Sequence, residues 1–88
     1  MLTVDNSAFE DVSVRHYPSE IFVGSVYSLQ SRTFRLCRLE GRQPTFIVHA
    51  IGGRWDRLGR GEGLQPMWPE SHYRVEVGPS QVWVKPAR

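Results

Sequence analysis

The sequence predicts an all-β fold, either a small antiparallel barrel or a sandwich. Three observations support this prediction. The apolar segments are rich in β-branched and aromatic residues, they alternate with polar residues at a period of two, and turn-forming residues separate them. A chain of 88 residues is the size of one domain. We therefore expect a single β domain over residues 1–88.

The first predicted strand covers about Asp11–Tyr17. Val12 and Val14 lie two residues apart, so both side chains point to the same face, which we expect to be buried. Pro18 and Ser19 are turn residues and end this strand.

A three-stranded meander is predicted next. Its strands are about Ile21–Leu29, Arg32–Glu40 and Thr45–Ile51, connected by Gln30-Ser31 and Gly41-Arg42. This register makes both faces of the meander apolar, with Tyr27 and Leu29 on one face and Cys37 within a buried strand. The meander therefore needs cover on both sides, which a barrel of SH3-like or OB-like size, a sandwich or a homo-oligomer interface would supply.

A helix over residues 31–42 is the competing interpretation. It would align Arg32, Arg35, Arg38 and Arg42 on one face. The apolar residues of this segment do not gather on the opposite face, as an amphipathic helix requires. We therefore favour the strand.

A C-terminal hairpin is the clearest unit of the sequence. Its strands cover residues 72–77 and 81–85, and Gly78-Pro79-Ser80 forms the turn. Pairing Gly78 with Gln81 places four valines on one face. The opposite face then carries Arg74, Glu76, Trp83 and Lys85.

The stretch 52–71 contains five glycines and two prolines. This composition predicts a long irregular loop, and loops of this length are usually functional or disordered. Tryptophan and arginine in it are the residue types that dominate protein–protein hot spots. The candidate partner-binding residues are those of the loop and of the hairpin's polar face: Arg54, Trp55, Arg57, Arg60, Trp68, Trp83 and Arg74.

The charge distribution leaves two kinds of partner open. Ten of the eleven basic residues are arginine, and seven of them lie within residues 21–61. Arginine binds carboxylates and phosphates, and tryptophan stacks on nucleic-acid bases. The first hypothesis is a small regulatory module that binds another protein, and the alternative is a β-barrel that binds single-stranded nucleic acid. A GC-rich genome would account for the same arginine excess without any binding role.

Residues typical of enzymes and metal sites are not grouped in this sequence. His16, His49 and His72 lack metal-ligand spacing, relative to each other and to Cys37. Residues 59–63 alternate glycine with charge but lack the Gly-Lys-Ser/Thr ending of a phosphate-binding loop. We expect a non-enzymatic protein with no catalytic residues, no cofactor and no metal.

The expected location is intracellular. A single cysteine cannot form an internal disulfide, and the N-terminal residues lack the pattern of a signal peptide. No apolar stretch approaches the ~20 residues that span a bilayer, so we expect no membrane partner. The prediction is a cytoplasmic protein, or one inside an infected host cell if the chain is of viral or phage origin.

Overall fold

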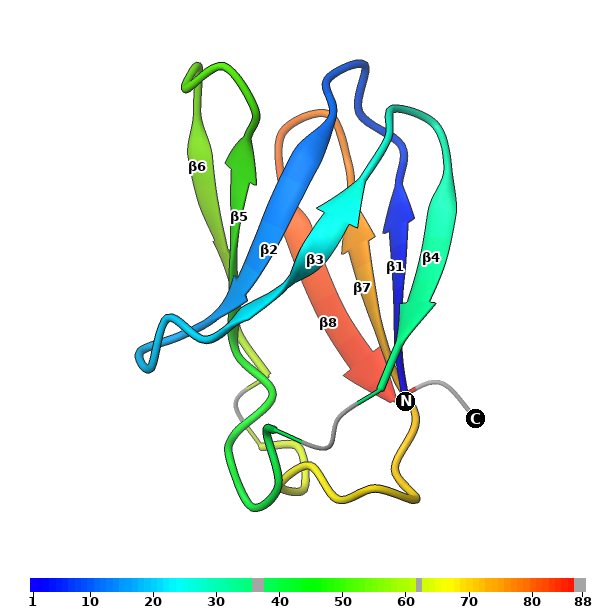
Figure 1. Ribbon diagram of the computed structural model, residues 1–88, viewed down its shortest axis with the longest axis vertical. Helices are drawn as coiled ribbons and strands as arrows, with labels where there is room; N and C mark the ends of the chain where they lie inside the picture. The colour runs from blue at the N-terminus through cyan, green and yellow to red at the C-terminus, as the bar shows by residue number, and fades with distance from the viewer. Residues whose placement is uncertain (36–37, 62, 87–88) are drawn as a thin grey trace.

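Within residues 1–35, 38–61 and 63–86, which the computed structural model describes, eight β-strands form two stacked sheets (Figure 1). The first sheet has the order β4-β1-β7-β8 and consists of β1 (Leu2–Asn6), β4 (Ser31–Phe34), β7 (Tyr73–Val77) and β8 (Val82–Pro86). The second has the order β3-β2-β5-β6 and consists of β2 (Val12–His16), β3 (Phe22–Val26), β5 (Phe46–Ala50) and β6 (Asp56–Gly59). The all-β prediction is confirmed, and the arrangement is a sandwich rather than a closed barrel. The prediction of an antiparallel fold is wrong for the first sheet, because β1 pairs parallel with β7.

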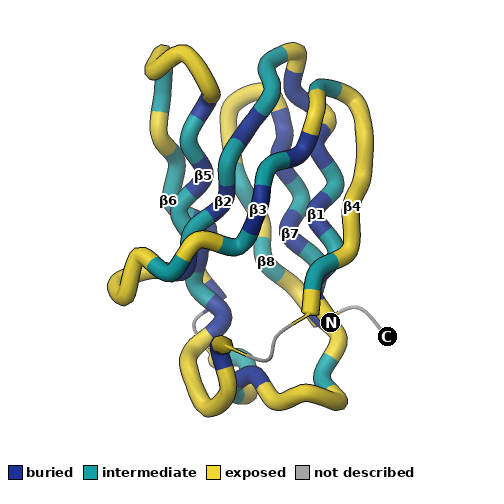
Figure 2. Tube along the Cα trace, in the orientation of Figure 1, coloured by how far each residue is buried: buried dark blue, intermediate teal, exposed yellow. Residues whose placement is uncertain are grey.

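The core lies between the central strands of the two sheets. In β1, β2, β5 and β7, buried residues alternate with partly exposed ones along each strand (Figure 2). This follows from the alternation of side chains along a strand. The buried apolar residues of these strands are Leu2, Val4, Val12, Val14, Phe46, Val48, Ala50, Tyr73, Val75 and Val77.

Strand β1 was not predicted from the sequence. It has only two apolar residues in the core, Leu2 and Val4, which is a weak period-two signal. It pairs antiparallel with β4 and parallel with β7, where Leu2 lies opposite Tyr73 and Val4 opposite Val75. Partners this distant in the chain stabilise a segment whose own sequence does not identify it as a strand.

The predicted meander is wrong in its pairing. Strand β2 lies between β3 and β5 in the second sheet, whereas β4 belongs to the first sheet and pairs with β1. The reason is that β3 ends at Val26 and the chain then crosses from one sheet to the other. Tyr27 and Leu29 lie in this crossover and are exposed, instead of lying on a covered face of a meander.

The second strand of the meander is also shorter than expected. Strand β4 ends at Phe34 rather than near Glu40. The competing interpretation, a helix over residues 31–42, is excluded for residues 31–34 because these residues form β4. Leu36 and Cys37 lie outside the described residues, so the expectation of a buried Cys37 stays a prediction.

The C-terminal hairpin is confirmed together with its register. Val77 lies opposite Val82, Val75 lies opposite Val84, and the Gly78 N–H donates to the Gln81 carbonyl at 2.8 Å. Val82 and Val84 pack against the core. The outer face carries the polar side chains, where Lys85 Nζ lies 3.1 Å from Glu76 Oε1.

The loop predicted over residues 52–71 contains strand β6, so that prediction is wrong for residues 56–59. β6 pairs with β5, with Arg57 opposite Val48 and Gly59 opposite Phe46. Beyond β6, Met67 is 0% exposed. Its N–H donates to the Arg42 carbonyl at 2.9 Å, and its carbonyl accepts from the Gly41 N–H at 2.6 Å. The described crossover residues 38–45 and 63–72 thus pack on each other at the lower end of the sandwich (Figure 1).

Candidate interaction surface

The most distinctive surface lies where β6 and β8, edge strands of different sheets, approach each other. Gly59 makes this approach close, because a Cβ there would lie 2.6 Å from a γ-carbon of Val82 and 3.0 Å from one of Val84. Any side chain at position 59 would therefore push the two strands apart. The seam between the sheets is closed by packing on this glycine.

Arg57 links the two sheets across the same seam. It lies opposite the buried Val48, so its side chain starts on the inner side of β6. Its guanidinium stacks 3.8 Å from the centre of the Trp55 ring, and Nη1 donates to the Gly78 carbonyl at 3.0 Å. Trp55 is partly buried and packs against the core. Trp55 thus anchors the side chain of Arg57.

Trp83 projects from the opposite side of β8, on the polar outer face of the first sheet. It pairs with Glu76 across the hairpin and is 48% exposed. Its indole rests on Gly78, where a Cβ would lie 2.8 Å from Cζ3 of the ring. The backbone of Gly78 therefore fixes the place of a large, half-exposed aromatic ring on an otherwise polar face.

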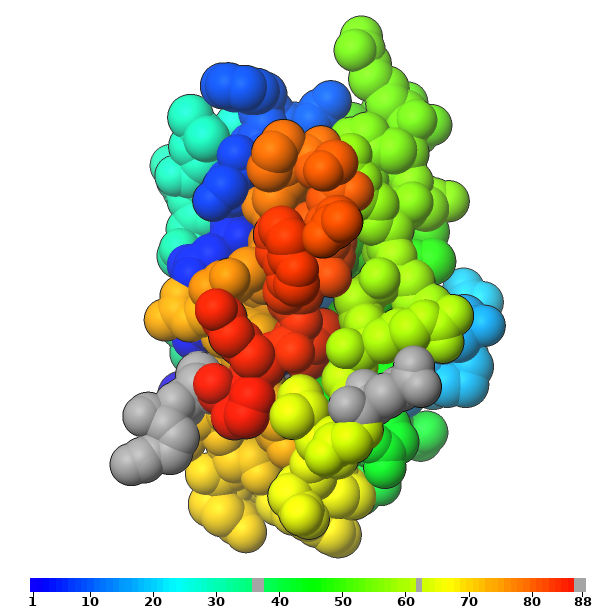
Figure 3. All heavy atoms as spheres, turned by 180° about the vertical axis from the view of Figure 1, so that it is seen from behind, coloured from blue at the N-terminus to red at the C-terminus, as the bar shows by residue number. Residues whose placement is uncertain are grey.

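A hollow of about 540 Å³ lies between β6 and β8. Figure 3 shows this face of the molecule, with β8 in red beside the green β6. Charged, apolar and small polar side chains line the hollow: Arg57, Leu58, Arg60, Ser80, Gln81, Val82, Trp83 and Val84. Three of the predicted contact residues, Arg57, Arg60 and Trp83, therefore meet at one site.

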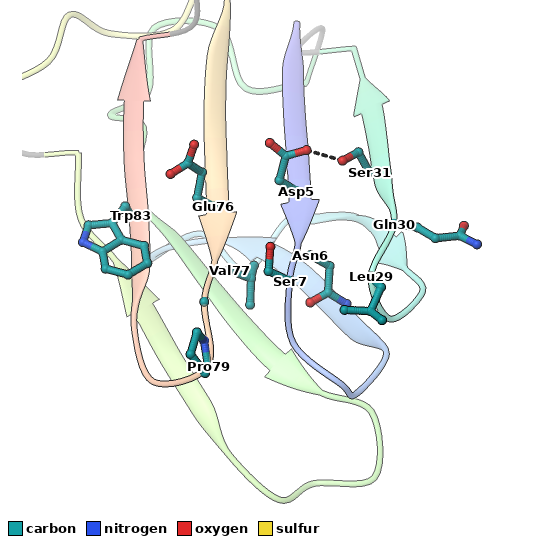
Figure 4. Close-up of a pocket in the computed structure, with 11 residues that line it drawn as sticks. Asp5, Asn6, Ser7, Leu29, Gln30, Ser31, Glu76, Val77, Pro79 and Trp83 are labelled. Atoms are coloured by element: carbon teal, nitrogen blue, oxygen red, sulfur yellow. Dashed lines mark hydrogen bonds between the residues drawn. The ribbon is translucent and has the colours of Figure 1, made fainter.

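A second hollow, of about 510 Å³, lies over the first sheet, at the end where β1 and β7 finish (Figure 4). Trp83 lines it together with Leu29 and the carboxylates of Asp5 and Glu76. Figure 4 shows Asp5 accepting a hydrogen bond from Ser31. Because Trp83 lines both hollows, its indole forms the ridge between them.

The two hollows differ in electrostatics. On the first sheet the charges are paired, since Arg74 donates to Asp5 and Lys85 pairs with Glu76. Beside β6, the two contacts of Arg57 are with a carbonyl and an aromatic ring, so its positive charge faces no carboxylate among the described residues. The hollow between β6 and β8 is therefore suited to a negatively charged group.

Trp55, the fourth predicted contact residue of this region, lies against Arg57, and the other three lie elsewhere. Arg54 is exposed in the turn between β5 and β6, at the upper end of the sandwich. Trp68 is 47% exposed at the lower end, where its ring lies 3.5 Å from the place that a Cβ of Gly41 would occupy. Arg74 lies on the outer face in its pair with Asp5. The seven residues thus do not form one surface.

Sequence reasoning missed the apolar side chains at the upper end of the sandwich. Phe9 is 87% exposed, and Tyr27, Leu29 and Ile51 are exposed on the other loops at this end. The buried Asn6 joins two of these loops, because its Nδ2 donates to the carbonyls of residues 10 and 27 at 2.9 and 3.2 Å. The sequence contains one signal of this surface, because Phe9 is an apolar residue that lies outside any segment with period-two spacing.

The part of the chain that the structure describes has neither a candidate metal site nor a candidate membrane-spanning helix. No group of three or more His, Cys, Asp or Glu side chains there could hold a metal ion. No helix there is long and apolar enough to span a membrane. In comparisons with known proteins, no family model, no curated protein and no solved structure matches this chain.

Proposed function

We propose that this chain is a small non-enzymatic module that binds another protein through the surface around Trp83, Arg57 and Arg60. The observation that carries the proposal is the position of Trp83. A half-exposed indole forms the ridge between two hollows, on a sheet face that is otherwise polar.

The chemistry of this surface supports a protein partner. Tryptophan and arginine contribute most to hot spots because they bury a large area and keep a polar group for a directed hydrogen bond. The ring of Trp83 rests on Gly78, and the guanidinium of Arg57 is stacked on Trp55. Both groups therefore lose little conformational entropy on binding, which favours affinity.

Single-stranded nucleic acid is the alternative ligand for the same surface. Arg57 and Arg60 line one hollow with Trp83, so phosphate binding and base stacking would be adjacent. Asp5 and Glu76 line the hollow on the other side of the ring. Arg74 and Lys85 balance these carboxylates, so this hollow offers no excess positive charge to a phosphate backbone that continues past Trp83, and for this reason we favour a protein partner.

The experiment compares two tryptophans of equal exposure. Tagged wild-type protein, Trp83→Ser and Trp68→Ser are used to capture proteins from an extract of the source cells, and the captured proteins are quantified by mass spectrometry. Trp83→Ser should reduce the specific partner at least about tenfold, as expected when a hot-spot residue is lost. Trp68→Ser, at the far end of the sandwich, should retain it.

The same proteins are titrated with a labelled 20-nucleotide thymidine strand. Salt-sensitive binding, with a salt dependence that falls by about one unit in Arg57→Ala, would favour the nucleic-acid alternative. Equal capture by Trp83→Ser and wild type would contradict the proposed protein-binding surface.

A further inference from the structure

We infer that β8 binds an extended, acidic segment of the partner protein as an added β-strand, in the hollow between β8 and β6. This inference rests on the proposed function and goes beyond it, because it names the conformation and the charge of the bound segment. It follows from the backbone of β8, the boundaries of that strand and the charge beside it.

The backbone groups of two residues in β8 point into the hollow. In an antiparallel pair, hydrogen-bonded and non-bonded residue pairs alternate. The Gly78 N–H donates to the Gln81 carbonyl, so the next pair, Val77 and Val82, is a non-bonded one, and so is the pair of Val75 and Val84. The N–H and C=O groups of Val82 and Val84 therefore point away from β7.

These groups are accessible because β6 approaches β8 without pairing with it. The two strands belong to different sheets, and Gly59 packs against the side chains of Val82 and Val84. The hollow of about 540 Å³ lies over this contact and is lined by both valines. An extended peptide placed there meets an open sheet edge, the site at which strand addition occurs.

The length of the pairing segment is set by its two ends. Pro79 and Ser80 form the hairpin turn, so pairing begins after them. Pro86 lies opposite Tyr73, and its backbone, like that of Val82 and Val84, faces away from β7. Proline has no N–H, so it cannot donate a hydrogen bond to an added strand. The segment open for pairing is therefore residues 81–85, which is about 16 Å long at the usual rise of a strand.

The side chains around this edge indicate the sequence of the bound segment. Residues of an added strand that lie opposite Val82 and Val84 would point toward the seam, on the side of Arg57. The guanidinium of Arg57 faces no carboxylate among the described residues, so an acidic side chain fits there. The peptide residue between the two that lie opposite Val82 and Val84 would lie beside Trp83, where an apolar or aromatic side chain fits. The expected motif has period two, with acidic residues alternating with apolar ones.

The test begins with a displayed library of random eight-residue peptides selected on the wild-type protein. The enriched peptides should alternate acidic with apolar residues and lack proline. The best peptide is then synthesised, and so are two versions methylated on backbone nitrogens at alternate residues, one at the odd positions and one at the even positions. Only alternate N–H groups of an added strand face β8, so one of the two versions should bind at least about tenfold more weakly and the other should bind like the unmethylated peptide.

Two variants at one position test the protein side. Val84→Pro removes the outward N–H, as Pro86 already does two residues on, whereas Val84→Ala shortens the side chain and keeps the N–H. Val84→Pro should weaken the peptide at least about tenfold relative to Val84→Ala. In amide hydrogen exchange on the wild-type protein, the bound peptide should protect the N–H groups of Val82 and Val84.

Equal binding of the unmethylated peptide and both methylated versions would overturn strand addition, and so would enrichment of basic or proline-rich peptides. If Trp83→Ser still abolishes partner capture in that case, the proposed interaction surface stands and only the strand mode is wrong. If Trp83→Ser has no effect either, the proposed function fails with it.

Discussion

At the scale of single residues, buried polar groups organise the loops of this protein. His16 is buried in β2, its Nε2–H donates to the Gln43 carbonyl at 2.9 Å, and its Nδ1 accepts from the Ser19 hydroxyl at 2.6 Å. One ring thus joins the turn after β2 to the segment before β5. Burial lowers the pKa of His16, the Gln43 carbonyl opposes this effect, and the charge of Arg42 adds to it.

The stability of the protein should fall on mild acidification because of His16. In the unfolded chain the imidazole has a pKa near 6.5, and its pKa in the folded protein is lower. The unfolded state therefore binds more protons as the pH falls, so the contribution of neutral His16 is complete above about 6.5 and is lost below it. Urea denaturation at pH 7.5 and 5.5 should show a lower free energy of unfolding at pH 5.5.

The control for this prediction is His16→Gln, which keeps polar atoms and does not titrate. Its free energy of unfolding should differ less between the two pH values than that of the wild type. An equal loss in both proteins would assign the pH dependence to other groups.

At the scale of strands, the two sheets are packed together in the same way along both sides of the sandwich. Gly59 of β6 accommodates valines of β8, and Gly24 of β3 accommodates Phe34 of β4, whose ring lies 2.2 Å from the place of a Cβ at Gly24. Across each seam an arginine donates to a carbonyl of the other sheet, Arg57 in one and Arg32, at 2.9 Å, in the other. Side chains thus take over the role that hydrogen-bonded pairs would have in a closed barrel.

Gly59→Ala should destabilise the protein by about 1–3 kcal/mol, because the new methyl group overlaps Val82 in a packed seam. Alanine suits a strand better than glycine does, so strand propensity alone would predict the opposite sign. Chemical denaturation measures the difference. In the double variant Gly59→Ala with Val82→Ala, the overlap is relieved and the loss should be smaller than the sum of the single losses. Strictly additive losses would contradict packing at this contact.

At the scale of the whole molecule, two crossovers between the sheets close the lower end of the sandwich. Leu39 and Met67 are buried there, one from each crossover. Gly61 allows the segments to touch, since a Cβ at this residue would lie 2.2 Å from the Pro44 carbonyl oxygen. The hydroxyl of Tyr73 donates to the Gln65 carbonyl and connects this cap to the first sheet.

Met67→Ala should lower the free energy of unfolding by about 2–5 kcal/mol, because it leaves a cavity beneath both crossovers. The neighbouring Trp68→Ala, at a half-exposed position, should cost much less. Thermal or urea denaturation of both variants measures this difference. A small effect of Met67→Ala would show that the cap contributes little to the stability of the sandwich.

The sequence by itself determined the all-β class of this protein and the pairing of its C-terminal hairpin. The alternation of valines predicts the hairpin and its register, because the turn and both strands are adjacent in the chain. It also predicts the outward position of Trp83, since side chains alternate strictly along a strand.

The tertiary structure decided which strands are neighbours and which contact residues meet. Strand β1 is stabilised by β7 at the other end of the chain, and the strands of the expected meander belong to two sheets. Within the predicted loop, pairing of residues 56–59 with β5 brings Arg57 to Trp83 and leaves Arg54 and Trp68 at opposite ends. The physical reason is that period-two spacing specifies a face of each strand, whereas contacts between distant strands depend on how all the faces pack together.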